Sequence, residues 1–229
     1  MYFVAQAQPQ ERAEFIKKTY THLAGAVGAF IGIECLLFQS GLAEVITQSL
    51  MGSRFGWLAV LAGFMVLGWL SRELAARADS ISLQYAGLGL YVVGEAIIFT
   101  PLLYMASRFS DPNVIPSAGI LTLLLFAGLT AIAFTTGKDF TFLGGVLKIG
   151  GCIALGLIIC SALFGFTLGL FFSVFMVGFA AAAILYDTSK IMHHYTSNQY
   201  VAASLELFAS VALLFWYVLR ILMSLSSRR

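Results

Sequence analysis

Long apolar runs separated by short polar segments recur along the whole chain. An apolar helix needs about 20 residues to cross the hydrocarbon of a bilayer, and seven runs approach or exceed this length. They cover residues 20–40, 56–72, 82–106, 114–136, 142–162, 165–187 and 200–224. The pattern therefore predicts an all-α integral membrane bundle of about seven transmembrane helices.

Helix-breaking residues mark most boundaries between these runs. Asp111–Asn113 and Pro116 separate the third and fourth runs, and Gly137–Asp139 separates the fourth and fifth. No charge separates the fifth and sixth runs, so Gly165 is a weak marker there. Pro101 lies inside the third run and predicts a kink or an early helix end, because proline lacks the N–H that a helix interior uses.

Composition supports a membrane location for these runs. Hydrophobic residues make up 60% of the 229 residues and charged residues only 10%, whereas a soluble domain carries roughly 25% charged residues. Lipid must therefore cover apolar surface that a core of this size could not hide. We expect one transmembrane domain over residues 20–229, after a short cytoplasmic segment over residues 1–19. No internal repeat is found, which counts against inverted-repeat transporters.

Lysine and arginine in the connections indicate the orientation. The side that holds the N-terminus receives seven of them, namely Arg12, Lys17, Lys18, Arg72, Arg77, Lys138 and Lys190. The loops of the other side receive Arg54 and Arg108. This asymmetry places the N-terminus in the cytoplasm, and the first 20 residues resemble no cleavable signal. Arg220, Arg228 and Arg229 fall outside if the last helix spans fully and inside if it re-enters, so the side of the C-terminus stays open.

Small residues and cysteines indicate packing rather than chemistry. Gly28 with Gly32, and Gly165 with Gly169, have the spacing of four that lets helix backbones approach closely in lipid. The three cysteines lie within apolar runs, which argues against a disulfide framework or a metal site and favours buried packing residues. The net charge of +2 suggests no nucleic-acid partner.

Ionisable residues inside the predicted spans are the informative ones. A charge near the bilayer centre costs at least about 2.5–3.5 kcal/mol, so it needs a partner, a cavity or a neutralising proton. Lys148 can snorkel to the interface. Glu34, toward the outer end of the first span, does the same or lies protonated among neighbouring helices. Glu95 lies near the middle of the third span, as a functional group or a neutral packing group. Glu34 and Glu95 are the candidates for an ion path.

Asp187 and Glu206 form the most informative pair. Each lies roughly 7–9 Å inside the membrane on consecutive antiparallel helices joined by a short cytoplasmic turn, and Ser210 lies one helical turn deeper than Glu206. Two carboxyls in a poorly solvated site cannot both ionise cheaply, so they can share a proton and act as a pH-dependent gate. The alternative is that Asp187 caps the inner interface and Glu206 faces lipid headgroups. We expect Asp187 to hydrogen-bond either Glu206 or Ser210.

No motif supports catalysis or a cofactor. The doublet His193–His194 points in two directions on a helix, so it predicts a solvated loop pair rather than a metal site. The chain shows no hydrolase elbow, phosphate-binding loop, zincin helix or haem attachment site. We therefore expect a protein that is not an enzyme and binds no cofactor.

Three segments resemble the Bax inhibitor motif (TMBIM) family. They are the signature block 184–193 (ILYDTSKIMH), the turn 138–145 (KDFTFLGG) and the ending 219–222 (LRIL). The resemblance implies a bundle whose last helix is central and wrapped by the other six. It also implies a pH-sensitive calcium leak controlled by an aspartate dyad. Asp187 matches the first aspartate, but the second falls on Ser210, so Glu206 supplies the missing carboxylate or the gate is absent.

The serine at this dyad position also resembles a bacterial branch of the family. Members of that branch are described as modulators of the membrane-anchored FtsH-type ATP-dependent protease, which implies the bacterial inner membrane. The family further implies an arginine of the second helix near the dyad, for which Arg72 is the candidate. Two functions therefore stay open: a cation (calcium) leak channel gated by protonation, and a non-transporting protease modulator. A conducting path requires Glu95 and the Asp187 pair to face one cavity.

Overall fold

The computed structural model describes residues 4–6, 8–51, 54–77 and 79–226, and within these ranges it contains helices and no strands. Seven of its helices are long and apolar enough to cross a membrane. They are α1 (Pro9–Gln39), α3 (Arg54–Ala75), α4 (Ile81–Phe109), α5 (Val114–Thr136), α6 (Leu143–Phe164), α7 (Leu170–His193) and α8 (Tyr200–Ser226). The short helices η1 (Val4–Gln6) and α2 (Leu42–Met51) complete the described chain. The predicted all-α bundle of seven membrane helices is confirmed.

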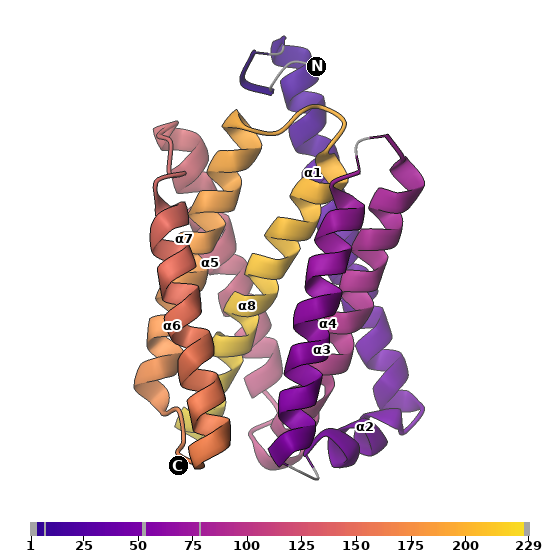
Figure 1. Ribbon diagram of the computed structural model, residues 1–229, viewed down its shortest axis with the longest axis vertical. Helices are drawn as coiled ribbons and strands as arrows, with labels where there is room; N and C mark the ends of the chain where they lie inside the picture. The colour runs from indigo at the N-terminus through magenta and orange to yellow at the C-terminus, as the bar shows by residue number, and fades with distance from the viewer. Residues whose placement is uncertain (1–3, 7, 52–53, 78, 227–229) are drawn as a thin grey trace.

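The long helices run side by side, and the two termini lie at opposite ends of the bundle (Figure 1). We call the end that holds η1 and the α3–α4, α5–α6 and α7–α8 connections the N-terminal end. The end that holds α2 and the α4–α5 and α6–α7 connections is the C-terminal end. Because α8 is one continuous helix, it runs through the whole length of the bundle (Figure 1). Arg228 and Arg229 lie outside the described residues.

Helices α8 and α4 form the centre. In the most apolar stretch of each, 50% of α8 and 61% of α4 is buried, compared with 11% to 28% in the other spans. Helix α8 packs against α1, α3, α4, α5 and α7. Aromatic rings join the two central helices, because Phe99 stacks on Phe215 at 5.7 Å and meets the edge of Trp216 at 4.9 Å. The last helix is central as the resemblance implied, and α4 shares that place.

Several boundaries differ from the sequence prediction. Helix α1 begins at Pro9 instead of near residue 20, and α4 continues through Pro101 to Phe109, so the proline does not end it. The sequence predicts the sixth span over residues 165–187, but α7 begins at Leu170. Gly165 ends α6 with a φ of +76°, a left-handed conformation that glycine adopts without a Cβ clash.

The predicted close packing at two glycine pairs is wrong. A Cβ on Gly28 or Gly32 would meet nothing within 4 Å, and Gly165 and Gly169 lie in the α6–α7 connection. A close approach of two helix backbones lies instead between α3 and α4, where a Cβ on Gly87 would stand 2.5 Å from the Ser71 carbonyl oxygen. This contact holds α3 against the central helix α4.

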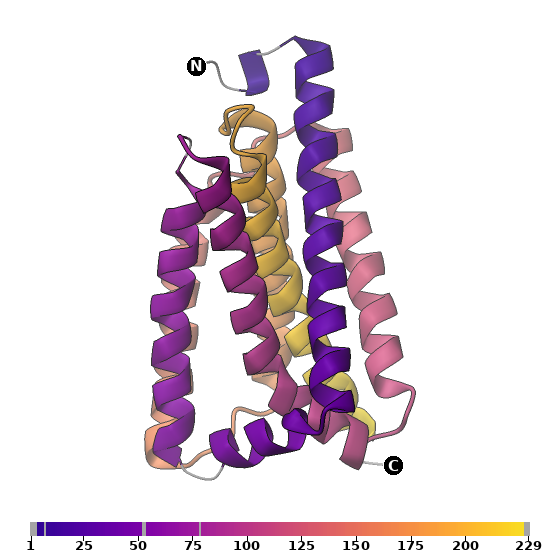
Figure 2. The same ribbon diagram turned by 90° about the vertical axis from the view of Figure 1, so that its right-hand side faces the viewer.

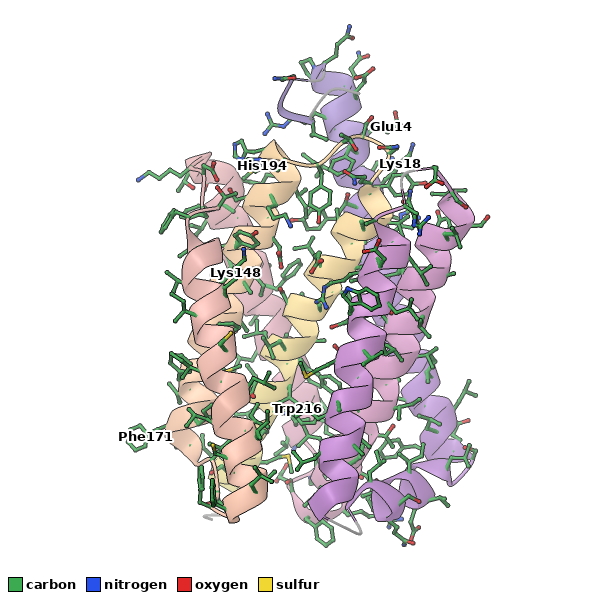
Figure 3. The ribbon with its side chains drawn as sticks, viewed as in Figure 1. Glu14, Lys18, Lys148, Phe171, His194 and Trp216 are labelled. Atoms are coloured by element: carbon green, nitrogen blue, oxygen red, sulfur yellow. The ribbon has the colours of Figure 1, made fainter. Side chains whose placement is uncertain are left out.

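The outside of the bundle is apolar. Phe171 projects away from α7 and is 94% exposed (Figure 3), and Trp69 is 65% exposed. Cys35 and Cys152 also lie on this exposed surface, which corrects their expected burial. Lys148 is exposed on the N-terminal half of α6. A surface of this kind is what a lipid-embedded protein presents.

Candidate functional site

A cavity of about 720 Å³ lies between the α3–α4 and α6–α7 sides of the bundle, against α8. Figure 3 shows Trp216 of α8 in the space between α3 and α6, and this residue lines the cavity. Most of the wall is apolar, as expected among membrane helices. The polar exceptions include five ionisable residues and one serine, which are the informative ones: Arg72, Glu95, Asp187, Glu206, Arg220 and Ser210.

The first polar contact joins α7 to α8. Ser210 Oγ donates a hydrogen bond of 2.6 Å to Asp187 Oδ2, and the two residues are 7% and 8% exposed. Antiparallel helices joined by a short turn bring residues of equal depth together, which is why the sequence could predict this contact. Of the two partners expected for Asp187, the structure selects Ser210.

The second polar contact joins α3 to α8. Arg72 Nε donates to both carboxyl oxygens of Glu206, at 3.1 and 3.2 Å. Its guanidinium also lies over the ring of Tyr91, 5.4 Å from the ring centroid. The two side chains are 44% and 27% exposed. This partly exposed ion pair therefore lies at the N-terminal mouth of the cavity and links α3 to the central helix α8.

The two acidic residues of the predicted pair thus have separate partners. Asp187 is held by a hydroxyl and Glu206 by a guanidinium, so neither of these contacts is a proton shared between two carboxyls. The arginine that the resemblance implied lies in this cluster, next to Glu206. The depth of each residue along its predicted span did not by itself indicate the Arg72–Glu206 pair.

The cavity continues along α8 toward the C-terminal end. Glu95, 6% exposed, faces it from the middle of α4. Arg220 lies at the far end, where its Nη2 donates to the carbonyl oxygen of Leu168 at 3.3 Å. Glu206 and Arg220 are separated by about 21 Å along α8 at 1.5 Å per residue. Three carboxyl groups therefore lie between two arginines in one cavity, and Arg220 was not predicted as a site residue.

Glu34 lies outside this cavity. It is 6% exposed and accepts a hydrogen bond of 3.3 Å from Thr100 Oγ1. It lines a second cavity between α1, α4, α5 and α8. The structure therefore separates the two glutamates that the sequence offered as an ion path, although Phe99 borders both cavities.

A polar latch at the N-terminal end joins the two most characteristic sequence segments. Asp139 in the α5–α6 connection accepts from Ser189 Oγ at 3.1 Å and from the Thr141 N–H at 2.8 Å. Hydrogen bonds from Thr141, and then from Ser189, lower the pKa of Asp139 to about 2. His194 Nε2 lies 3.8 Å from the same carboxyl group. Within the described residues, no group of three or more acidic, histidine or cysteine side chains could hold a metal ion.

Known proteins similar to this chain agree with this picture. The family described as "Inhibitor of apoptosis-promoting Bax1" matches residues 12–227. An uncharacterised Pseudomonas aeruginosa protein is 32% identical over 221 residues, which is 95% of this chain and 92% of that protein. The Escherichia coli K12 "Modulator of FtsH protease YccA" is 30% identical over 186 residues, 80% of this chain and 82% of that protein. The same identity and coverage hold for the "Inner membrane protein YccA" of Escherichia coli O6:H1.

Proposed function

This chain belongs to the Bax inhibitor family of multi-pass membrane proteins, and from this premise we propose that it is a pH-sensitive cation (calcium) leak channel. The observation that carries the proposal is the common cavity of Glu95, Asp187 and Glu206. Carboxylates inside a membrane protein replace part of the hydration that a cation loses. Oxygen ligands of this kind are the ones that calcium prefers.

The Arg72–Glu206 pair closes the cavity in this proposal. The pair spans the N-terminal mouth, and the positive guanidinium repels an entering cation. Asp187 is neutral when it carries a proton, and it then contributes only its hydrogen bond with Ser210. When Asp187 loses the proton, its negative charge competes with Glu206 for Arg72 and attracts cations. Lys190, on the same helix as Asp187, also attracts that charge. Flux is therefore expected to rise with pH.

Calcium flux into proteoliposomes between about pH 6 and pH 8, the neutral range toward which functional sites shift the pKa of their groups, tests this proposal. We expect the wild type to leak more at the higher pH, and Asp187→Asn to flatten this response because asparagine cannot ionise. Glu95→Gln should lower conduction and keep the pH response. Glu73→Gln is the control, because Glu73 is exposed beside Arg72 and does not line the cavity. Identical flux of the wild type and Asp187→Asn at both pH values would exclude the gate.

The second candidate function is modulation of an FtsH-type protease in the bacterial inner membrane. It is favoured by the 30% identity to the Escherichia coli modulator and by Ser210 at the position where the family resemblance implies the second aspartate of the dyad. The test is the degradation rate of a membrane substrate of FtsH in Escherichia coli cells that lack their own modulator. Slower degradation on expression of this chain, together with no calcium flux in liposomes, would favour this function over the leak.

A further inference from the structure

The second cavity has a volume of about 540 Å³ and lies between α1, α4, α5 and α8. Its wall is almost wholly apolar and unusually rich in phenylalanine, with rings from three of the four helices. These rings are Phe30, Phe38, Phe99, Phe208 and Phe215. No part of the proposed leak path uses this cavity.

Glu34 is the carboxyl group of this apolar wall. Its Oε2 accepts the hydrogen bond from Thr100, but Oε1 is buried and has no hydrogen-bond partner among the described residues. Across the cavity on α5, Thr122 Oγ1 is also buried and also has no hydrogen-bond partner among the described residues. A buried acceptor without a donor is costly, so these two oxygens indicate a ligand that carries N–H or O–H groups.

The cavity is reached from the lipid side. Ile31 and Leu123 border it from α1 and α5 and are 54% and 57% exposed. Near the N-terminal end, α1 and α5 are joined by Tyr20, whose ring lies 6.3 Å from that of Phe126. Figure 2 shows the two helices apart at the bottom of the view. Glu34 lies roughly 7–8 Å from the C-terminal end of α1, at the depth of one leaflet.

We propose that this cleft binds a lipophilic ammonium, a protonated amine on an apolar chain, which enters from the bilayer. The ammonium donates to Glu34 Oε1, the phenyl rings face its positive charge, and its chain lies along the apolar wall. Aromatic rings around a cation are a known recognition mode for ammonium ligands. A neutral lipid chain would leave Oε1 unpaired, and a metal ion would find too few oxygen ligands here. Ammonium binding and the calcium leak are proposed for different cavities, so an experiment can contradict one proposal and leave the other standing.

Native mass spectrometry of the purified full chain in a non-ionic detergent tests the proposal, with dodecylamine and dodecanol as matched probes. We expect one dodecylamine to bind the wild type at least about tenfold more tightly than dodecanol, as for a charge-assisted hydrogen bond. Glu34→Gln should remove this preference. The control Glu44→Gln should keep it, because Glu44 is an exposed acid at the same end of the bundle.

Phe38→Leu supplies a second variant that keeps the carboxyl group. It should weaken dodecylamine binding and leave dodecanol binding nearly unchanged, because only the cation uses the ring. The melting temperature of each variant shows that it is folded. Equal binding of the two probes to the wild type, or an unchanged preference in Glu34→Gln, would show a plain lipid groove and overturn the proposal.

Discussion

At the residue scale, the two contacts of the carboxyl-lined cavity differ in how far the sequence could predict them. Asp187 and Ser210 are 23 positions apart and belong to one helical hairpin. Their depth in the membrane and their helical face were therefore sufficient to predict the contact. Arg72 and Glu206 are 134 positions apart and meet because α3 packs against α8. Spacing cannot indicate which non-consecutive helices touch. For this contact the sequence offered the family resemblance alone.

The Arg72–Glu206 pair leads to a prediction about coupling. Arg72→Gln and Glu206→Gln each remove the ion pair across the mouth, so each should raise calcium leak at about pH 6, the acid end of the flux series. The double variant should leak no more than the stronger single variant, because groups that act as one unit are not additive. Proteoliposome flux measures all three variants. Additive effects of the two substitutions would mean that the residues act separately.

At the element scale, the α3–α4 contact depends on a glycine. Gly87→Ala would place a Cβ 2.5 Å from the Ser71 carbonyl oxygen and 2.8 Å from the Ala75 nitrogen. Backbone atoms cannot move away cheaply, so we expect a loss of roughly 1–3 kcal/mol, typical of overpacking. Thermal unfolding in detergent measures this change. Gly89→Ala is the matched control on α4, since its Cβ would meet nothing within 4 Å, and it should be neutral or stabilising.

The latch between the α5–α6 connection and α7 predicts a stability change with pH. The pKa of Asp139 is lowered from 3.8 to about 2, so its ionised form is favoured in the folded state. The contribution of Asp139 to the free energy of unfolding is therefore complete above about pH 4, and it is lost as the pH falls toward 2. The melting temperature of the wild type should fall more steeply over this range than that of Asp139→Asn. Parallel curves for the two proteins would contradict the latch.

The elements themselves were largely predictable, for a physical reason. A membrane span must be long and apolar, so the hydropathy of the sequence indicated each of the seven. Helix α2 is too short to cross a membrane, and Glu44 and Gln48 interrupt its apolar residues, so hydropathy does not indicate it. The α6–α7 boundary was misplaced because the connecting residues Phe166–Leu168 are themselves mostly apolar. Gly165 is the residue that marks the end of α6, but its left-handed conformation is visible only in the structure.

At the scale of the whole molecule, the central helices separate two cavities with different chemistry. The cavity between the α3–α4 and α6–α7 sides holds carboxyl groups and arginines, whereas the cavity between α1 and α5 holds Glu34 among phenyl rings. Phe99 of α4 borders both. The sequence showed which helices carry acids, but their division between two cavities depends on how the helices pack around α8.

The last prediction concerns orientation. Seven crossings put the termini on opposite sides, and α8 is continuous from Tyr200 to Ser226. The excess of lysine and arginine at the N-terminal end predicts that this end lies in the cytoplasm. In Escherichia coli, alkaline phosphatase fused after Arg229 should therefore be active, because this enzyme needs the oxidising periplasm for its disulfides. A fusion after Lys138 should be inactive, and one after Ser110 active. An inactive C-terminal fusion beside an active fusion at Ser110 would mean that α8 does not span the membrane, and the carboxyl-lined cavity would then lose its central wall.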